Sequence, residues 1–115
     1  MTSPDIVELV RRLTAALGST LVSTLAGATD TRAALSWSAD GGLRPDGEAS
    51  KRLECADAAW RTVSHAESDQ AARLWFIGAN PFLRGEDSVI TANREGRFDE
   101  VVGAAQALAN DSFSG

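Results

Sequence analysis

Apolar residues near the start of the chain recur at intervals of three and four, as they do along one face of an amphipathic helix. Ser3 and Pro4 precede this stripe and suit the cap and the first turn of a helix, and Gly18 follows it and suits a helix end. We therefore predict a first helix over this segment. Its apolar stripe consists of Ile6, Leu9, Val10, Leu13 and Leu17.

Two shorter apolar stripes follow and predict two short helices. The first is expected to be capped by Ser19 and to stop near Gly27, and the second is expected over residues 31–37 with Asp30 as its cap. Residues 40–47 combine glycine, proline and aspartate, which together mark a loop. The pattern therefore places two short helices close together along the chain, before a loop.

A long fourth helix is expected from about Glu48, with Leu53 and Trp60 on its apolar face. Ser64 and Glu67 stand at the spacing of a capping box, in which two side chains satisfy exposed backbone groups at a helix start. We therefore predict that a fifth helix opens at Ser64.

The last third of the chain predicts two further helices. An asparagine–proline turn at residues 78–81 ends the fifth helix, a short helix is expected over residues 87–92, and a last helix over residues 98–108. Residues 110–115 are expected to form a polar tail. Because no segment alternates polar and apolar residues for long enough to predict a strand, the predicted fold class is all-α.

A chain of 115 residues has room for one compact domain or two very small subdomains that share a core. We expect the latter, with residues 1–64 as a DNA-binding and dimerisation unit and residues 65–115 as a second unit. The apolar stretches are too short for a membrane span, and the N-terminal residues lack the pattern of a secretory signal. A cytoplasmic protein without a membrane partner is therefore expected.

The net charge of −5 is unevenly distributed along the sequence. Residues 1–65 carry seven basic and eight acidic residues, whereas residues 66–115 carry four arginines and eight acidic residues. An acidic protein binds nucleic acid only through a local basic patch. The nearly neutral first part is therefore the only place where DNA contact is expected.

The sequence offers little catalytic chemistry. A nucleophilic pair would need His65 close to Cys55 or to a serine, with a carboxylate to orient the imidazole, but ten residues and an expected helix end separate the two. The sequence contains neither a phosphate-binding glycine loop nor a metal-ligand spacing. It also contains no pair of carboxylates with a clear catalytic role. We expect a protein that is not an enzyme and has no catalytic residue, metal or cofactor.

The second and third predicted helices are spaced like a helix-turn-helix, in which the start of the second helix faces base edges in the major groove. The alternative is an ordinary corner in a helical bundle. In the DNA-binding interpretation, three residues would face bases and three would meet phosphates. These are Thr31, Arg32 and Ser36, and Arg44, Lys51 and Arg52, respectively.

An ordered series of motifs occupies the C-terminal third. In order, these are Arg73-Leu74-Trp75-Phe76, Asn80-Pro81-Phe82-Leu83-Arg84-Gly85, Val89-Ile90, Gly96-Arg97-Phe98 and Glu100-Val101-Val102. This series resembles the C-terminal toxin-binding domain of antitoxins of the Xre/MbcA/ParS family. Trp37 and the predicted helix-turn-helix agree with the N-terminal domain of that family, so the resemblance spans about residues 5–105.

The resemblance implies a function and a partner. Antitoxins of this family bind a co-encoded toxin, commonly one with a RES domain that acts on NAD, and occlude its active-site cleft. They usually form a homodimer within the toxin–antitoxin complex and repress their own operon by binding operator DNA. The chain is therefore expected to neutralise a RES-type toxin.

Several residues are expected to contact the toxin. Phe82 and Leu83 lie on an irregular segment that can present apolar side chains to a partner pocket, and Phe113 in the polar tail has no obvious core to join. Core packing is the alternative role for Trp75, Phe82 and Leu83. The full predicted set is Trp75, Asn80, Pro81, Phe82, Leu83, Arg84, Gly85 and Phe113.

Two other functions remain open at this point. The chain could be a stand-alone helix-turn-helix transcriptional regulator whose C-terminal half only dimerises. It could also be an interaction module that has lost DNA binding, since the predicted recognition helix contains a single arginine. A toxin-like neighbouring gene would favour the antitoxin, and an isolated gene would favour the regulator.

Overall fold

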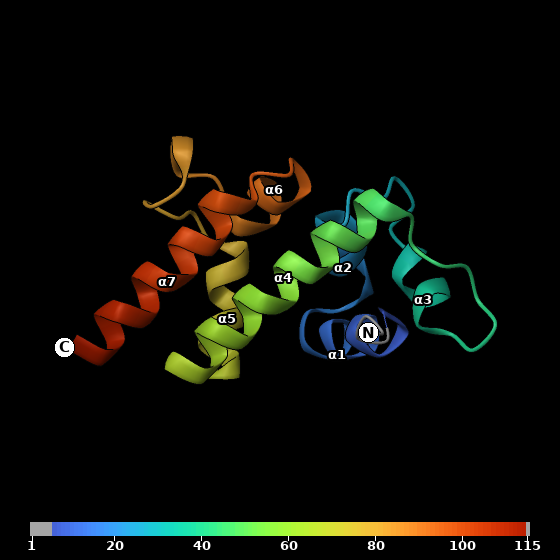
Figure 1. The fold of residues 1–115 in the computed structure, drawn as a ribbon, viewed down its shortest axis with the longest axis horizontal. Coiled ribbons are helices and arrows are strands. Elements are labelled where there is room, and N and C mark those ends of the chain that lie inside the picture. Colours follow the sequence, from blue (N-terminus) through green and yellow to red (C-terminus); the bar gives the residue numbers. More distant parts are fainter. Residues whose placement is uncertain (1–5, 115) are drawn as a thin grey trace.

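The computed structural model describes residues 6–114, and the side chains of residues 6–111, as an assembly of helices (Figure 1). Within the described residues no strand is present, only an isolated antiparallel bridge between Ala79 and Ser88. The prediction of an all-α fold is therefore confirmed. In chain order the helices are α1 (Ile6–Leu17), α2 (Ser19–Leu25), α3 (Ala33–Ser38), α4 (Gly47–Ala66), α5 (Asp69–Ile77), the short 3-10 turn η1 (Arg84–Glu86), α6 (Val89–Arg94) and α7 (Phe98–Ser114).

Helix α4 is the central element, and α7 packs along it (Figure 1). Helix α4 also contacts α1, α2, α5 and α6. Ala56 and Ala59 of α4 are buried, as are Ala104 and Ala105 of α7. Small side chains on both helices let the two backbones approach closely, so each helix buries a continuous face.

Hydrogen bonds from α6 join it to the first part of the chain. Buried Asn93 donates from Nδ2 to the backbone carbonyls of Leu25 and Arg52, at 2.9 and 3.0 Å. Arg94 donates from Nη1 to the carbonyls of Thr24 and Ala28, at 2.7 and 3.1 Å. These bonds join α6 to the end of α2, to the turn that follows α2 and to α4.

The predicted capping box at Ser64 is wrong. Helix α4 continues to Ala66, and so crosses the expected boundary between residues 64 and 65. Ser68 caps α5, with its hydroxyl accepting a hydrogen bond from the backbone N–H of Ala71 at 3.0 Å. Ser64 and Ser68 are four residues apart, so the sequence pattern placed the cap of α5 one helical turn too early.

Three other boundaries differ from the prediction. Ser19 was expected to cap α2, but it is the first residue of that helix and Gly18 occupies the capping position, with no side-chain cap. Asp30 accepts a hydrogen bond from the N–H of Arg32 at 2.8 Å, which stabilises a turn ahead of α3 instead of capping the helix itself. Helix α7 runs to Ser114, where a polar tail was expected from residue 110. The expected cap and first position at Ser3 and Pro4 lie outside the described residues.

We expect Phe76→Ala to lower the free energy of unfolding by about 3–5 kcal/mol, because the ring is fully buried and its loss leaves a cavity. Leu74→Ala on the same helix is the matched control. Its side chain is 66% exposed, so we expect a loss of no more than about 1 kcal/mol. Urea denaturation followed by circular dichroism measures both, and equal losses would contradict the assigned core.

Candidate functional site

Residues that could act as nucleophile and base are not brought together. Cys55 and His65 both lie on α4, where ten residues correspond to a rise of about 15 Å. Cys55 is half-buried, and burial raises the pKa of its thiol to about 11. Among the described residues no group of three histidine, cysteine or acidic side chains could hold a metal ion.

None of the helices in residues 6–114 combines the length and the apolar character that a bilayer crossing requires.

The residues predicted to face base edges lie around the start of α3. Thr31 and Arg32 are exposed in the turn ahead of the helix. The Ser36 hydroxyl accepts a hydrogen bond from the backbone N–H of Leu43 at 3.1 Å, and this contact holds the following loop against α3. Thr31 and Arg32 are therefore open to a ligand, whereas Ser36 already has a structural contact.

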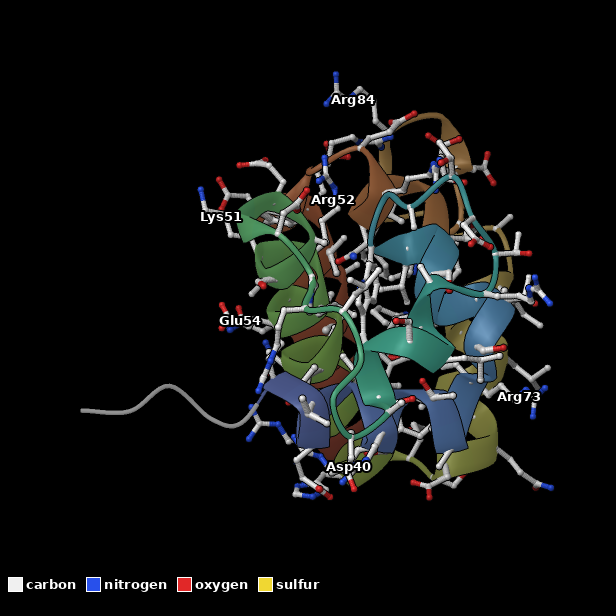
Figure 2. The ribbon with its side chains drawn as sticks, turned by 90° about the vertical axis from the view of Figure 1, so that its right-hand side faces the viewer. Asp40, Lys51, Arg52, Glu54, Arg73 and Arg84 are labelled. Carbon is white, nitrogen blue, oxygen red and sulfur yellow. The ribbon has the colours of Figure 1, made fainter. Side chains whose placement is uncertain are left out.

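Two of the residues predicted to meet phosphates, Lys51 and Arg52, lie near the start of α4 (Figure 2). Arg44 is exposed in the preceding loop, and Lys51 is 3.7 Å from the Glu48 carboxylate. Arg52 is half-buried and donates from Nε to the carbonyl of Arg94 at 2.8 Å. The cations thus share this surface with a carboxylate, and one of them is held by an internal contact.

The segment between α5 and α6 is held in a defined conformation by Asn80. This side chain is buried, and its Oδ1 accepts a hydrogen bond from the backbone N–H of Phe82 at 2.9 Å. The Asn80 carbonyl accepts from the N–H of Leu83 at 3.0 Å, and its N–H donates to the carbonyl of Asp87 at 3.2 Å. As a result Leu83 points into the core, 3% exposed, while Phe82 is 64% exposed.

Arg97 fixes the far end of the same segment. Its guanidinium donates to the carboxylates of Asp87, Glu95 and Glu100 at 2.7–2.9 Å, and to the carbonyl of Arg84 at 3.3 Å. These hydrogen bonds raise the pKa of Arg97 above its ordinary value. Hydrogen bonds from Arg97, and then from Arg84, lower the pKa of Glu100 well below its usual range.

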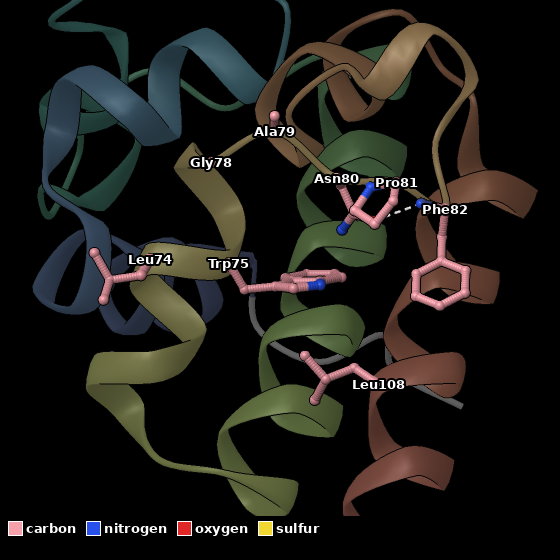
Figure 3. A pocket seen from close by; sticks show the side chains of 8 residues that line it. All are labelled: Leu74, Trp75, Gly78, Ala79, Asn80, Pro81, Phe82 and Leu108. Atoms are coloured by element: carbon pink, nitrogen blue, oxygen red, sulfur yellow. Dashed lines mark hydrogen bonds between the residues drawn. The ribbon is translucent and has the colours of Figure 1, made fainter.

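An apolar groove opens between α5, this segment and α7 (Figure 3). It has a volume of about 180 Å³ and is lined by residues 78–82 together with Leu74, Trp75 and Leu108. In Figure 3 the Trp75 ring lies between α5 and α7, with Leu108 below it and Phe82 on the side of the loop. The groove therefore has large apolar side chains on several sides.

Three large apolar side chains are exposed on α5 and on the segment that follows it. Leu74 is 66% exposed and Phe82 is 64% exposed, and both line the groove. Ile77 is 46% exposed and lies next to Leu74 on the surface of α5, three residues further on. In Figure 3 the Leu74 side chain points away from Trp75 and Phe82, so we call only Phe82 and the groove the Phe82 face.

The predicted toxin-contacting residues are divided by the structure. Trp75, Asn80, Pro81 and Phe82 line the groove. The other four lie elsewhere: Leu83 is buried, Arg84 pairs with Glu100 at 2.8 Å, Gly85 adopts a positive φ of 70° in η1, and the side chain of Phe113 lies outside the described residues.

Sequence reasoning missed Leu74, Ile77 and Leu108. Leu74 and Ile77 lie off the buried stripe of α5, which contains Ala72 and Phe76. Large apolar residues outside the core stripe of a short helix were the available signal for an interaction surface.

We expect Glu100→Gln to be less stable than the wild type at pH 7, and the difference to shrink as the pH falls below about 4. The folded-state pKa of Glu100 is lowered, so its contribution is complete above the ordinary carboxyl pKa and is lost as the carboxylate is protonated. Urea denaturation at a series of pH values measures this.

The control is Asp99→Asn, which alters the adjacent exposed carboxylate. Its difference from the wild type is expected to be smaller and to vary less with pH. A Glu100→Gln difference that stayed constant from pH 7 to pH 2 would contradict the assigned hydrogen bonds.

We expect Cys55 to react slowly with iodoacetamide at pH 8. With a thiol pKa of about 11, only about one molecule in a thousand carries the thiolate at that pH, and the rate should rise roughly tenfold per pH unit up to pH 10. Mass spectrometry of timed samples measures the rate, with a cysteine in a short unstructured peptide as reference. Reaction as fast as the peptide would contradict the burial.

Comparison of the chain with protein-family models, with curated proteins and with solved structures found no match in any of the three. The likeness of residues 73–103 to the antitoxin family therefore stays a prediction, as does the helix-turn-helix arrangement.

Proposed function

We propose that this protein is an antitoxin that binds and neutralises a toxin encoded beside it, and that the Phe82 face makes the contact. The observation that carries the proposal is the exposure of Phe82 beside an apolar groove that Trp75 and Leu108 also line. Complete burial of a large apolar side chain contributes about 1.5–3 kcal/mol relative to exposure. An exposed aromatic side chain beside an apolar groove is a credible centre for an interface.

The fixed conformation of the Phe82 segment supports this proposal. Asn80 and Arg97 hold the segment from both ends through hydrogen bonds to backbone and carboxylate groups. A side chain on an ordered segment loses less conformational entropy on binding than one on a flexible loop. Little of the free energy gained by burying Phe82 in an interface is therefore offset by the entropy lost on ordering it.

The family resemblance names the class of partner. The order of motifs over residues 73–103 is similar to that in antitoxins that occlude RES-domain toxins, and the Phe82 face belongs to that segment. The acidity of residues 66–115 suits a toxin cleft lined with basic residues for a negatively charged substrate such as NAD. Steric occlusion needs no reaction by the antitoxin.

A DNA-binding role is the second candidate. It is favoured by the exposure of Thr31 and Arg32 immediately ahead of α3, the position that a helix-turn-helix uses for base contact. In this proposal the protein, alone or as a homodimer with its toxin, represses its own operon. A mobility-shift assay with the upstream DNA, with and without the toxin, tests this role separately from neutralisation.

We expect Phe82→Ala to weaken binding to the product of the neighbouring gene by about 30-fold or more, the loss typical of a central interface residue. Leu43→Ala is the matched control. Leu43 is 74% exposed but lies in the loop between α3 and α4, so its removal should change the affinity by less than about threefold.

Isothermal titration calorimetry on the purified proteins measures both affinities, and growth of cells that express the toxin reports neutralisation. The proposal fails if no stable complex forms, or if the Phe82→Ala protein binds and protects as well as the wild type.

A further inference from the structure

We propose that Arg44 and Arg52 form a binding site for the phosphate group of a small molecule. The site lies where the turn between α2 and α3 faces the start of α4. It contains no part of the Phe82 face, so the inference goes beyond the proposed function and does not depend on it.

Arg52 is a half-buried cation without a carboxylate partner. Its Nε donates to the carbonyl of Arg94 at 2.8 Å, and within residues 6–111 no hydrogen bond or ion pair joins its Nη1 or Nη2 to another group. Half-buried Arg97, by contrast, is surrounded by three carboxylates. Because a guanidinium is costly to remove from water unless an anion replaces the water, Arg52 is suited to an anion from outside the chain.

Gly27 helps to fix the guanidinium of Arg52. Its φ of 86° favours glycine, and a Cβ atom at this position would lie 3.4 Å from Nη1 and 3.5 Å from Cζ of Arg52. The guanidinium therefore lies close against the turn that follows α2, while its Nε is bound to the Arg94 carbonyl. A group held by two contacts before a ligand arrives loses less entropy when the ligand binds.

A cavity of about 280 Å³ opens beside Arg52. Arg44 lines it from the loop before α4, and makes no hydrogen bond or ion pair with the residues that the structure describes. Buried Ala26, Trp37 and Ala49 form its apolar side. Guanidinium groups bind phosphate oxygens through pairs of parallel hydrogen bonds. Two of them on one cavity, close in size to the smallest small-molecule sites of about 300 Å³, therefore suit a compact phosphate ligand.

The acidic residues on this cavity already have partners. Asp46 and Glu48 both line it. The Oδ1 atom of Asp46 accepts a hydrogen bond from a backbone N–H of α4 at 2.8 Å, and Glu48 lies 3.7 Å from Nζ of Lys51. Lys51, Arg44 and Arg52 together carry one more charge than these two carboxylates. An anion that enters the cavity is therefore attracted.

The recessed position of Arg52 favours a small molecule over a DNA backbone. Figure 2 shows Lys51 and Glu54 on the outer side of α4, whereas Arg52 lies on the side toward the neighbouring elements. DNA presents a continuous row of phosphates, which would also pass close to the exposed carboxylates of α4 and be repelled by them. A single phosphate group needs only the cavity.

The first test titrates the full ¹⁵N-labelled chain with inorganic phosphate. Phosphate is expected to shift the NMR signals of the Arg52 Nε–H and of the backbone N–H groups of residues 26–28, and the shifts are expected to saturate. Sodium chloride at the same ionic strength is expected to give no saturating shift there. Equal shifts with both salts, or phosphate shifts only elsewhere on the chain, would overturn the inference.

The second test removes the arginines one at a time. Arg44→Gln and Arg52→Gln are each expected to weaken phosphate binding about tenfold, a typical loss for one charge-assisted contact. Arg44 makes no hydrogen bond or ion pair with the described residues, so Arg44→Gln keeps the test valid if Arg52→Gln does not fold. Arg32→Gln, at an exposed arginine outside the cavity, is the matched control and should leave the affinity unchanged. An Arg44→Gln protein that binds phosphate like the wild type contradicts the site.

A last comparison distinguishes the source of the phosphate group. Short double-stranded DNA of arbitrary sequence is expected to leave the signal of the Arg52 Nε–H unchanged. If DNA shifts this signal, the arginines meet a nucleic-acid backbone and the inference is wrong. The Arg44→Gln protein is expected to bind the product of the neighbouring gene like the wild type, so failure of this site and failure of the Phe82 face are seen in different measurements.

Discussion

The hydrogen bonds of Arg97 hold the segment between α5 and α6 to the start of α7, and the surface of the C-terminal part depends on them. The guanidinium joins Asp87, Glu95 and Glu100, which lie before α6, after α6 and at the start of α7, and it also reaches the carbonyl of Arg84. A planar group with five donors suits a role that one lysine could not fill. Because Arg97 fixes this end of the segment, Leu83 packs into the core and Phe82 is exposed to solvent.

The packing of α4 against α7 provides the rigid base for this arrangement. Small residues on both helices bring the backbones close, and Val63, Phe76 and Val101 are fully buried, whereas the ring of Phe82 lies outside the core. Leu74, Ile77 and Phe82 are therefore exposed and can contact another molecule. A protein that binds a partner through a fixed surface limits the entropy lost on association.

The sequence predicted the parts of this fold that depend on local periodicity. Leu9, Leu13 and Leu17 set the first helix because their spacing alone places them on one face. The cap of α5 was misplaced because Ser64 and Ser68 offer the same local chemistry, and only packing selects between them. The Arg97 cluster could not be predicted, since its carboxylates come from separate segments that the tertiary fold brings together. For the same reason Phe82 and Leu83, adjacent in sequence, could not be assigned to opposite environments.

Hydrogen–deuterium exchange of the protein alone and in complex with the product of the neighbouring gene tests the central claim most directly. The account predicts that binding slows exchange over residues 74–83 and in the second half of α7, and leaves residues 31–38 unchanged. Slower exchange confined to residues 31–38, with no change around Phe82, would contradict it.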